Sequence, residues 1–147
     1  LLEMLENNVR VGLGVDGSSS NDSGHMLNEA RQAMLLQRVK HSASVIGARD
    51  VLRTATRGGA EVLRRENIGQ IAPGFMADIA IYDMQSVDLA GTHTDPLAAL
   101  VFCGPIKTTH TIINGNLVVK HGQLTTMDLN ALLQKHRKLS VDLVNSA

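Results

Sequence analysis

Hydrophobic and polar residues follow two different periods along the chain, and the change falls near residue 74. Before that point, after one stretch of strict alternation, apolar residues recur three or four positions apart, as on one face of a helix. After it, short apolar runs alternate with turn residues, which is typical of strands. The pattern predicts a strand and helices, then a small β-rich unit, then a closing helix.

The first half is predicted to contain one strand and three helices. Two glycines leave one face of the strand nearly bare, which favours close packing against a neighbouring element such as a helix. Asp50 is expected to cap the second helix, and Gly58-Gly59 is expected to interrupt it. The predicted elements are a strand over 9–15, a polar loop over 16–23, and helices over 24–41, 51–57 and 60–65.

The second half is predicted to contain a hairpin. Asn114-Gly115 lies between two apolar runs, and this dipeptide favours a tight turn because both residues tolerate positive φ. An apolar run over 97–102 is too short to be assigned by its period. The remaining predicted elements are strands over 77–83, 109–113 and 117–119, and an amphipathic helix from Met127 to about Val144.

Composition narrows the class of protein. The 147 residues are 44% hydrophobic and 19% charged, as in a globular domain, and the formal net charge is zero. Neutral charge and 2% aromatic residues predict no nucleic-acid or anionic-membrane partner. No apolar run approaches the roughly 18 residues of a membrane span. One cysteine, Cys103, excludes an internal disulfide, and we expect a cytoplasmic protein.

Residues 12–17 spell Gly-x-Gly-x-x-Gly, the pattern of a dinucleotide-binding loop. Such a loop needs a helix that begins at its third glycine, here Gly17, so that the helix N-terminus faces the phosphates. Several polar residues follow Gly17 instead, and Asp16 would place a negative charge beside the phosphates. We therefore expect no nucleotide cradle here.

Asp16 is the residue of greatest chemical interest, because it ends the predicted strand and enters a polar loop. Functional residues of α/β barrels lie at this end of the strands, where a carboxylate could bind a divalent metal or accept a proton. Taken alone, the string Asp-Gly-Ser-Ser-Ser favours an ordinary turn or cap over a ligand. Asn21 and Asp22 are interpreted as caps or braces of the loop.

Several strings together resemble the amidohydrolase superfamily, in particular its aminohydrolases acting on purine and triazine rings. "GLGVDGSSSND" resembles the eighth barrel strand and its loop, and "VLRTATRGGAEVL" with "IGQIAPGFMADIAIYD" resembles the return to a β-sandwich. "TIINGNLVVKHGQL" resembles the last hairpin of that sandwich, and "SNDSGHMLNEARQAMLLQRV" with "DPLAALVFCGP" is most similar to 8-oxoguanine deaminases.

The resemblance implies an α/β fold with a defined division. Residues 1–66 would be the C-terminal part of a metal-dependent (β/α)8 barrel, its last strand and helices. Residues 67–125 would be part of a small β-sandwich, and residues 126–147 would be a closing helix. The chain would then be the C-terminal part of a longer protein. The resemblance is compatible with a homo-oligomer.

The resemblance also implies a hydrolytic deaminase with one divalent metal, normally zinc, and a small heteroaromatic substrate, above all 8-oxoguanine. Asp16 would be both the metal ligand and the catalytic proton acceptor. The family's other ligands, a His-x-His pair and a further histidine, have no counterpart among His25, His41, His93, His110, His121 and His136, so the isolated chain should be inactive. Triazine or adenosine-type aminohydrolases and a non-catalytic homologue are the alternatives.

Overall fold

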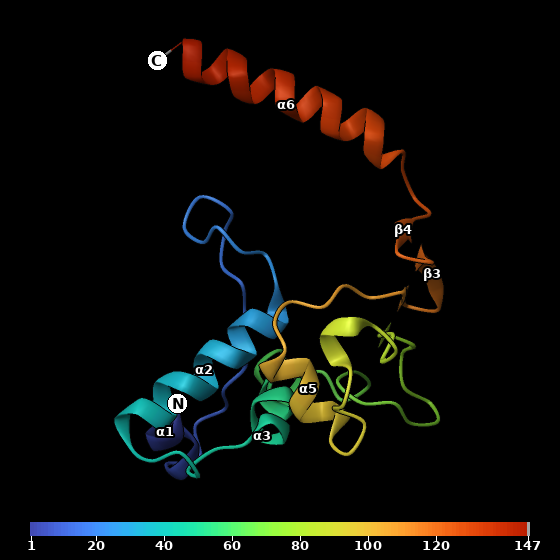
Figure 1. Cartoon of the computed structure of the whole chain (residues 1–147). Helices are drawn as coiled ribbons and strands as arrows, with labels where there is room; N and C mark the ends of the chain where they lie inside the picture. The colour runs from blue at the N-terminus through green and yellow to red at the C-terminus, as the bar shows by residue number, and fades with distance from the viewer. Residues whose placement is uncertain (147) are drawn as a thin grey trace.

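Helices dominate the first half of the chain in the computed structural model, which describes residues 1–146 (Figure 1). The predicted helix over 24–41 is confirmed with slightly narrower bounds, and its N-cap is His25. The elements are α1 (Leu2–Glu6), α2 (Met26–Lys40), α3 (Ala48–Arg53), the π-helical turn η1 (Thr54–Gly58) and α4 (Gly59–Val62).

The core lies where α2, α3 and α5 (Pro96–Phe102) meet. Leu27, Ala30 and Met34 recur at helical spacing on α2, so one face of that helix is buried. Met34 and Val51 are fully buried and belong to one cluster, which also contains Ala30, Ile46, Ala48 and Val101. The apolar spacing read from the sequence therefore does place one helix face in the core.

The strand predicted over residues 9–15 is wrong. The segment forms no ladder, because no other segment among residues 1–146 pairs with it, and a strand exists only through such pairing. Its glycine face does pack closely against a helix, as expected. A Cβ atom on Gly12 would lie 3.0 Å from the Cα of Gly59, and one on Gly58 would lie 2.2 Å from the carbonyl oxygen of Val11.

The expected cap and break around the second helix are also corrected. Gly47, not Asp50, is the N-cap of α3, and the Asp50 carboxylate accepts a hydrogen bond from the Gly47 backbone N–H at 2.8 Å. Gly58 and Gly59 do not interrupt the helix, because α3, η1 and α4 follow one another without a gap. Both glycines keep helical φ, and the missing Cβ atom of Gly58 leaves room for the close approach of residues 9–15.

The β-rich unit is a four-stranded antiparallel sheet in the order β1-β2-β3-β4. The predicted hairpin is confirmed, with Asn114 and Gly115 at positive φ in its turn. The backbone N–H of Asn114 donates to the Asp78 carboxylate at 2.7 Å, which ties this turn to β1. The strands are β1 (Ile79–Ile81), β2 (His110–Ile113), β3 (Asn116–Lys120) and β4 (Gln123–Leu124).

The apolar run over 97–102 is helix α5, and polar contacts of α2 hold it in place. Asp95 caps it by accepting from the Ala98 backbone N–H at 3.1 Å. The Arg31 guanidinium donates to the Phe102 carbonyl oxygen at 3.0 Å, and the Arg38 guanidinium lies 5.4 Å from the centre of the Phe102 ring. The Asp95 cap followed by Pro96 is a local start signal for this helix, which the period of so short an apolar run does not reveal. A 3-10 turn, η2 (Val87–Leu89), precedes it.

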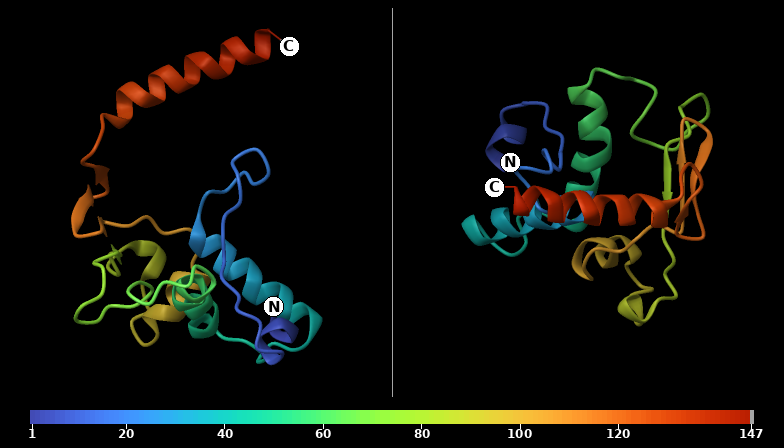
Figure 2. Two further views of the ribbon diagram at one scale, coloured as in Figure 1. Left: turned by 180° about the vertical axis from the view of Figure 1, so that it is seen from behind. Right: turned by 90° about the horizontal axis from the view of Figure 1, so that it is seen from above.

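The closing helix is confirmed as α6 (Leu129–Asn145), capped by the Asp128 carboxylate, which accepts from the backbone N–H groups of Asn130 and Ala131. None of its residues is buried, and it stands apart from the rest of the chain in Figure 1 and in the left view of Figure 2. No helix within residues 1–146 is both long and apolar enough to cross a membrane.

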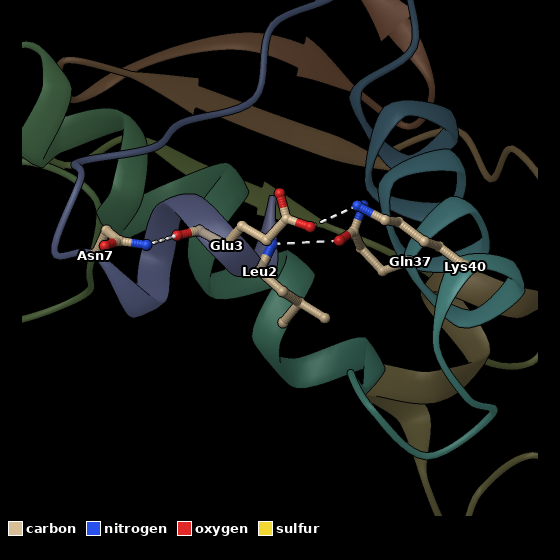
Figure 3. A network of polar contacts seen from close by, with 5 residues as sticks. All are labelled: Leu2, Glu3, Asn7, Gln37 and Lys40. Carbon is tan, nitrogen blue, oxygen red and sulfur yellow. Dashed lines mark hydrogen bonds and ion pairs between the residues drawn. The ribbon is translucent and has the colours of Figure 1, made fainter.

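A network of polar contacts fastens α1 to the end of α2 (Figure 3). The Leu2 backbone N–H donates to the Gln37 side-chain oxygen at 3.2 Å, and the Lys40 ammonium pairs with the Glu3 carboxylate. The hydrogen bond and positive charge of Lys40 lower the pKa of Glu3 below its ordinary value of 4.5. Both side chains are largely exposed, so solvent screens the pair.

Replacing Glu3 by Gln should lower stability slightly at neutral pH, and the loss should vanish in acid. The folded-state pKa is lowered, so the stabilisation is present above the ordinary pKa and disappears as the pH falls through the lowered value. Urea unfolding at several pH values between neutral and strongly acidic conditions measures it. Glu6→Gln on the same helix is the control, and a difference between the variants that persisted in strong acid would contradict the assignment.

Candidate active-site loop

Asp16 lies in an exposed loop directly after the segment that packs on η1 and α4. Its φ of +62° is in the left-handed region, which few residues other than glycine adopt and which aspartate tolerates better than most. One carboxylate oxygen accepts a hydrogen bond from the Gly17 backbone N–H at 2.7 Å. The carboxyl group does not cap a helix, because the N-cap of α2 is His25.

Asn21 braces this loop against α2, as its polar pattern suggested. Its amide nitrogen lies 2.8 Å from the Val15 carbonyl oxygen and 2.8 Å from a Glu29 carboxylate oxygen, and it donates to both. The Asn21 side-chain oxygen accepts from the Ser23 backbone N–H at 3.1 Å. The Gly17 N–H therefore holds one Asp16 carboxylate oxygen, and Asn21 ties the backbone just before Asp16 to the start of α2.

The geometry does not form a nucleotide cradle. The helix that should begin at Gly17 begins only at Met26, after an irregular loop. The backbone N–H groups of Ser20 and Asn21 are both used within the loop, since both donate to the Gly17 carbonyl oxygen at 2.9 Å. A pyrophosphate would thus find no helix N-terminus at the third glycine.

Asp16 alone does not make a metal site. Within residues 1–146, no group of three or more histidine, cysteine, aspartate or glutamate side chains is arranged to hold a metal ion. A catalytic zinc takes three protein ligands, and Asp16 offers only one exposed carboxylate. The rings of His110, in β2, and His121, in the turn between β3 and β4, meet edge to face with their centres 4.9 Å apart.

An apolar groove lies between the helices and the sheet, and no local sequence pattern marks it. It is lined from seven separate segments, among them those that hold Leu52 of α3, Leu100 of α5 and Val119 of β3. Tyr82 lies in it, and burial raises the pKa of its hydroxyl above 10.0. His25 also lines the groove, with a buried Nδ1 atom that has no hydrogen-bond partner. Asp16 is not among the lining residues.

Comparison with known proteins identifies the family. The model of the amidohydrolase family matches residues 1–118. The 8-oxoguanine deaminase of Pseudomonas aeruginosa is 41% identical over 134 residues, which is 91% of this chain and 30% of that enzyme.

Two solved structures share the fold. An adenosine deaminase from Xanthomonas campestris with bound zinc superposes with a TM-score of 0.88 at 29% identity, covering 98% of this chain and 33% of that one. The atrazine chlorohydrolase of Arthrobacter aurescens, complexed with zinc, gives 0.84 at 33% identity, covering 93% and 31%. The chain thus spans about a third of the length of the relatives it matches. It belongs to the amidohydrolase family.

Proposed function

We propose that this chain is the Asp16-bearing part of a metal-dependent deaminase that removes an amino group from a heteroaromatic ring by hydrolysis. The observation that carries the proposal is the Asp16 carboxylate, exposed on a braced loop in a chain of the amidohydrolase family. The zinc bound in two structural neighbours supports a divalent metal in the complete enzyme. Asp16 would supply one ligand, and the other ligands would come from residues outside this chain.

The chemistry assigned to Asp16 is proton transfer. A divalent metal in such a site lowers the pKa of a coordinated water toward neutrality. The Asp16 carboxylate would accept a proton from the attacking water and return it to the leaving nitrogen. One C–O bond forms at the ring carbon, the C–N bond breaks, and ammonia leaves. The Gly17 N–H and the Asn21 brace would hold the carboxylate in position through both transfers.

The substrate we favour is 8-oxoguanine, which would yield urate and ammonia. The 41% identity to an 8-oxoguanine deaminase over most of this chain supports that choice. Triazine and adenosine-type rings are the alternatives, because an atrazine chlorohydrolase and an adenosine deaminase share the fold. We place residues 1–66 in the last part of the barrel, 67–125 in the sandwich and 126–147 in the closing helix.

A chimaera tests the reaction class. The Pseudomonas aeruginosa 8-oxoguanine deaminase would carry residues 1–147 in place of its own matched segment, and ammonia release from 8-oxoguanine would be measured with and without a chelator. We expect release that the chelator abolishes, while the isolated 147-residue chain releases none. A chimaera that keeps the circular dichroism spectrum and elution volume of the parent enzyme but releases no ammonia would leave the non-catalytic homologue as the better description.

A further inference from the structure

Four arginine side chains line one open cavity beside the end of helix α4. They come from three parts of the chain: the segment over 9–15, the turn η1, and the residues that follow α4. The cavity has a volume of about 750 Å³, which is within the range of sites that bind small molecules. The four are Arg10, Arg57, Arg64 and Arg65, and they are called the arginine cluster below.

The arginine cluster has few partners among the residues that the structure describes, 1–146. In this part of the chain the guanidinium groups of Arg10, Arg57 and Arg64 form no hydrogen bond or ion pair. The guanidinium of Arg65 donates only to the sulfur atom of Met76, at 2.7 Å. A thioether is a weak acceptor, whereas each guanidinium has five N–H donors. Since all four residues are exposed, most of these donors are accessible to an anionic ligand.

The chain turns sharply after α4, and this turn carries two consecutive arginines of the cluster. The Arg65 backbone N–H donates to the Ala60 carbonyl oxygen at 3.0 Å, and the Arg64 backbone N–H donates to that of Glu61 at 3.2 Å. This pair of hydrogen bonds is a Schellman motif, in which the left-handed residue is normally glycine. Here that residue is Arg64, with a φ of +54°. A long cationic side chain thus occupies a place where glycine would strain the backbone less, which favours a role for the side chain itself.

The other residues that line the cavity narrow the class of ligand. Glu61 and Glu66 add two carboxylates to the four guanidinium groups, so the lining carries an excess of two positive charges. This excess matches one phosphate monoester, whose charge at neutral pH is between about −1.5 and −2. Phe75 and Ile68 add an aromatic ring and an apolar side chain to the lining. These two side chains offer a surface for an aromatic ring of the ligand.

We propose that the arginine cluster binds the phosphate group of a small phosphate monoester that carries an aromatic ring, such as a nucleoside monophosphate. Guanidinium forks bind phosphate oxygens in pairs, and three terminal oxygens can accept from forks that arrive from three parts of the chain. A carboxylate has only two oxygens, so it would leave more of these donors unused. The cavity is not lined by the glycine pattern over 12–17, and the inference does not depend on the role proposed for Asp16.

Isothermal titration calorimetry with the same chimaera tests this without measuring activity. Adenosine 5′-monophosphate (AMP) is the probe, and ribose 5-phosphate and inorganic phosphate are the probes that lack the ring. We expect AMP to bind more tightly than either of them. Arg57→Gln with Arg64→Gln should raise the Kd for AMP at least about tenfold, because charge-assisted hydrogen bonds to the phosphate are lost. Glutamine keeps good helix propensity, and circular dichroism of each variant checks that it is folded.

Arg49→Gln with Arg53→Gln is the matched control. It removes the same charge from the same run of helices, and neither residue lines the cavity. Its Kd for AMP should stay within about twofold of the parent chimaera, as for a surface change away from the ligand. Phe75→Leu should weaken AMP binding to the level of ribose 5-phosphate, and it should leave the Kd for ribose 5-phosphate unchanged, because only the contact with the ring is lost.

Three results would overturn the proposal. The first is that AMP at millimolar concentrations does not bind to the folded chimaera, which would mean that the arginines serve contacts within the complete enzyme. The second is equal weakening of AMP binding in the two double variants, which would assign the binding to overall positive charge. The third is that AMP binds no more tightly than inorganic phosphate, which would mean that the cavity does not recognise the ring.

Discussion

Asp16→Asn in the chimaera is expected to lower kcat/KM for ammonia release by about 10²- to 10⁴-fold, the range of a positioned acid–base group. Asparagine has nearly the same shape, and its oxygen can still accept the hydrogen bond from the Gly17 N–H that shapes the turn. What is lost is the negative charge and the ability to accept a proton. Initial rates and bound metal, measured on the same preparation, separate loss of chemistry from loss of the cation.

Asp22→Asn is the matched control, because Asp22 is another exposed carboxylate in the same loop and is given no part in the chemistry. Its kcat/KM should stay within about twofold of the parent chimaera, as for a surface change away from the reacting atoms. Equal losses in the two variants would mean that loop charge, and not the Asp16 carboxylate itself, governs the rate. Full activity of the Asp16→Asn chimaera would remove Asp16 from the catalytic machinery.

Gly58→Ala should reduce the free energy of unfolding by about 2–3 kcal/mol, the usual cost of forcing a methyl group into a filled space. The added Cβ would lie 2.2 Å from the Val11 carbonyl oxygen, a backbone atom that cannot rotate away as a side chain does. Either residues 9–15 or the helical run must move. Because residues 9–15 lead into the Asp16 loop, the shift would also displace the candidate site. Urea unfolding followed by far-ultraviolet circular dichroism measures the change.

The neighbouring glycine provides the control within the same helical run. A Cβ on Gly59 would have no heavy atom within 4 Å, and its φ of −59° suits alanine. Gly59→Ala should therefore be neutral or stabilising by up to about 1 kcal/mol, the difference in helix propensity. If both variants were equally destabilised, a general intolerance of alanine in this turn, rather than contact with Val11, would be the cause.

Elements that depend on local chemistry were predicted well. The Asn114-Gly115 turn needs two residues that accept positive φ, and both adopt it. Helix α2 follows from the spacing of its buried residues, and α6 from its apolar stripe and the Asp128 cap. Turn geometry, capping and helical period involve residues a few positions apart, so the sequence contains the information directly.

Elements that depend on distant partners were predicted less well. The alternation over residues 9–15 reads as a strand, but a strand also requires a paired neighbour, and the described chain offers none. Gly58-Gly59 reads as a helix break, yet the helical run is continuous, and contact with the Val11 carbonyl oxygen makes glycine the required residue at position 58. The groove that holds Tyr82 draws on segments far apart in sequence, so no local pattern marks it.

The sequence by itself determined the family, the hairpin, two long helices and Asp16 as the residue to test, because each depends on a short string of residues. Only the tertiary structure decided that residues 9–15 lie against glycines instead of pairing, and that Asp16 is exposed in a left-handed turn braced by Asn21. It also decided that α6 buries none of its residues within the described part of the chain, 1–146. These features depend on which distant surfaces meet, and local periodicity does not encode that.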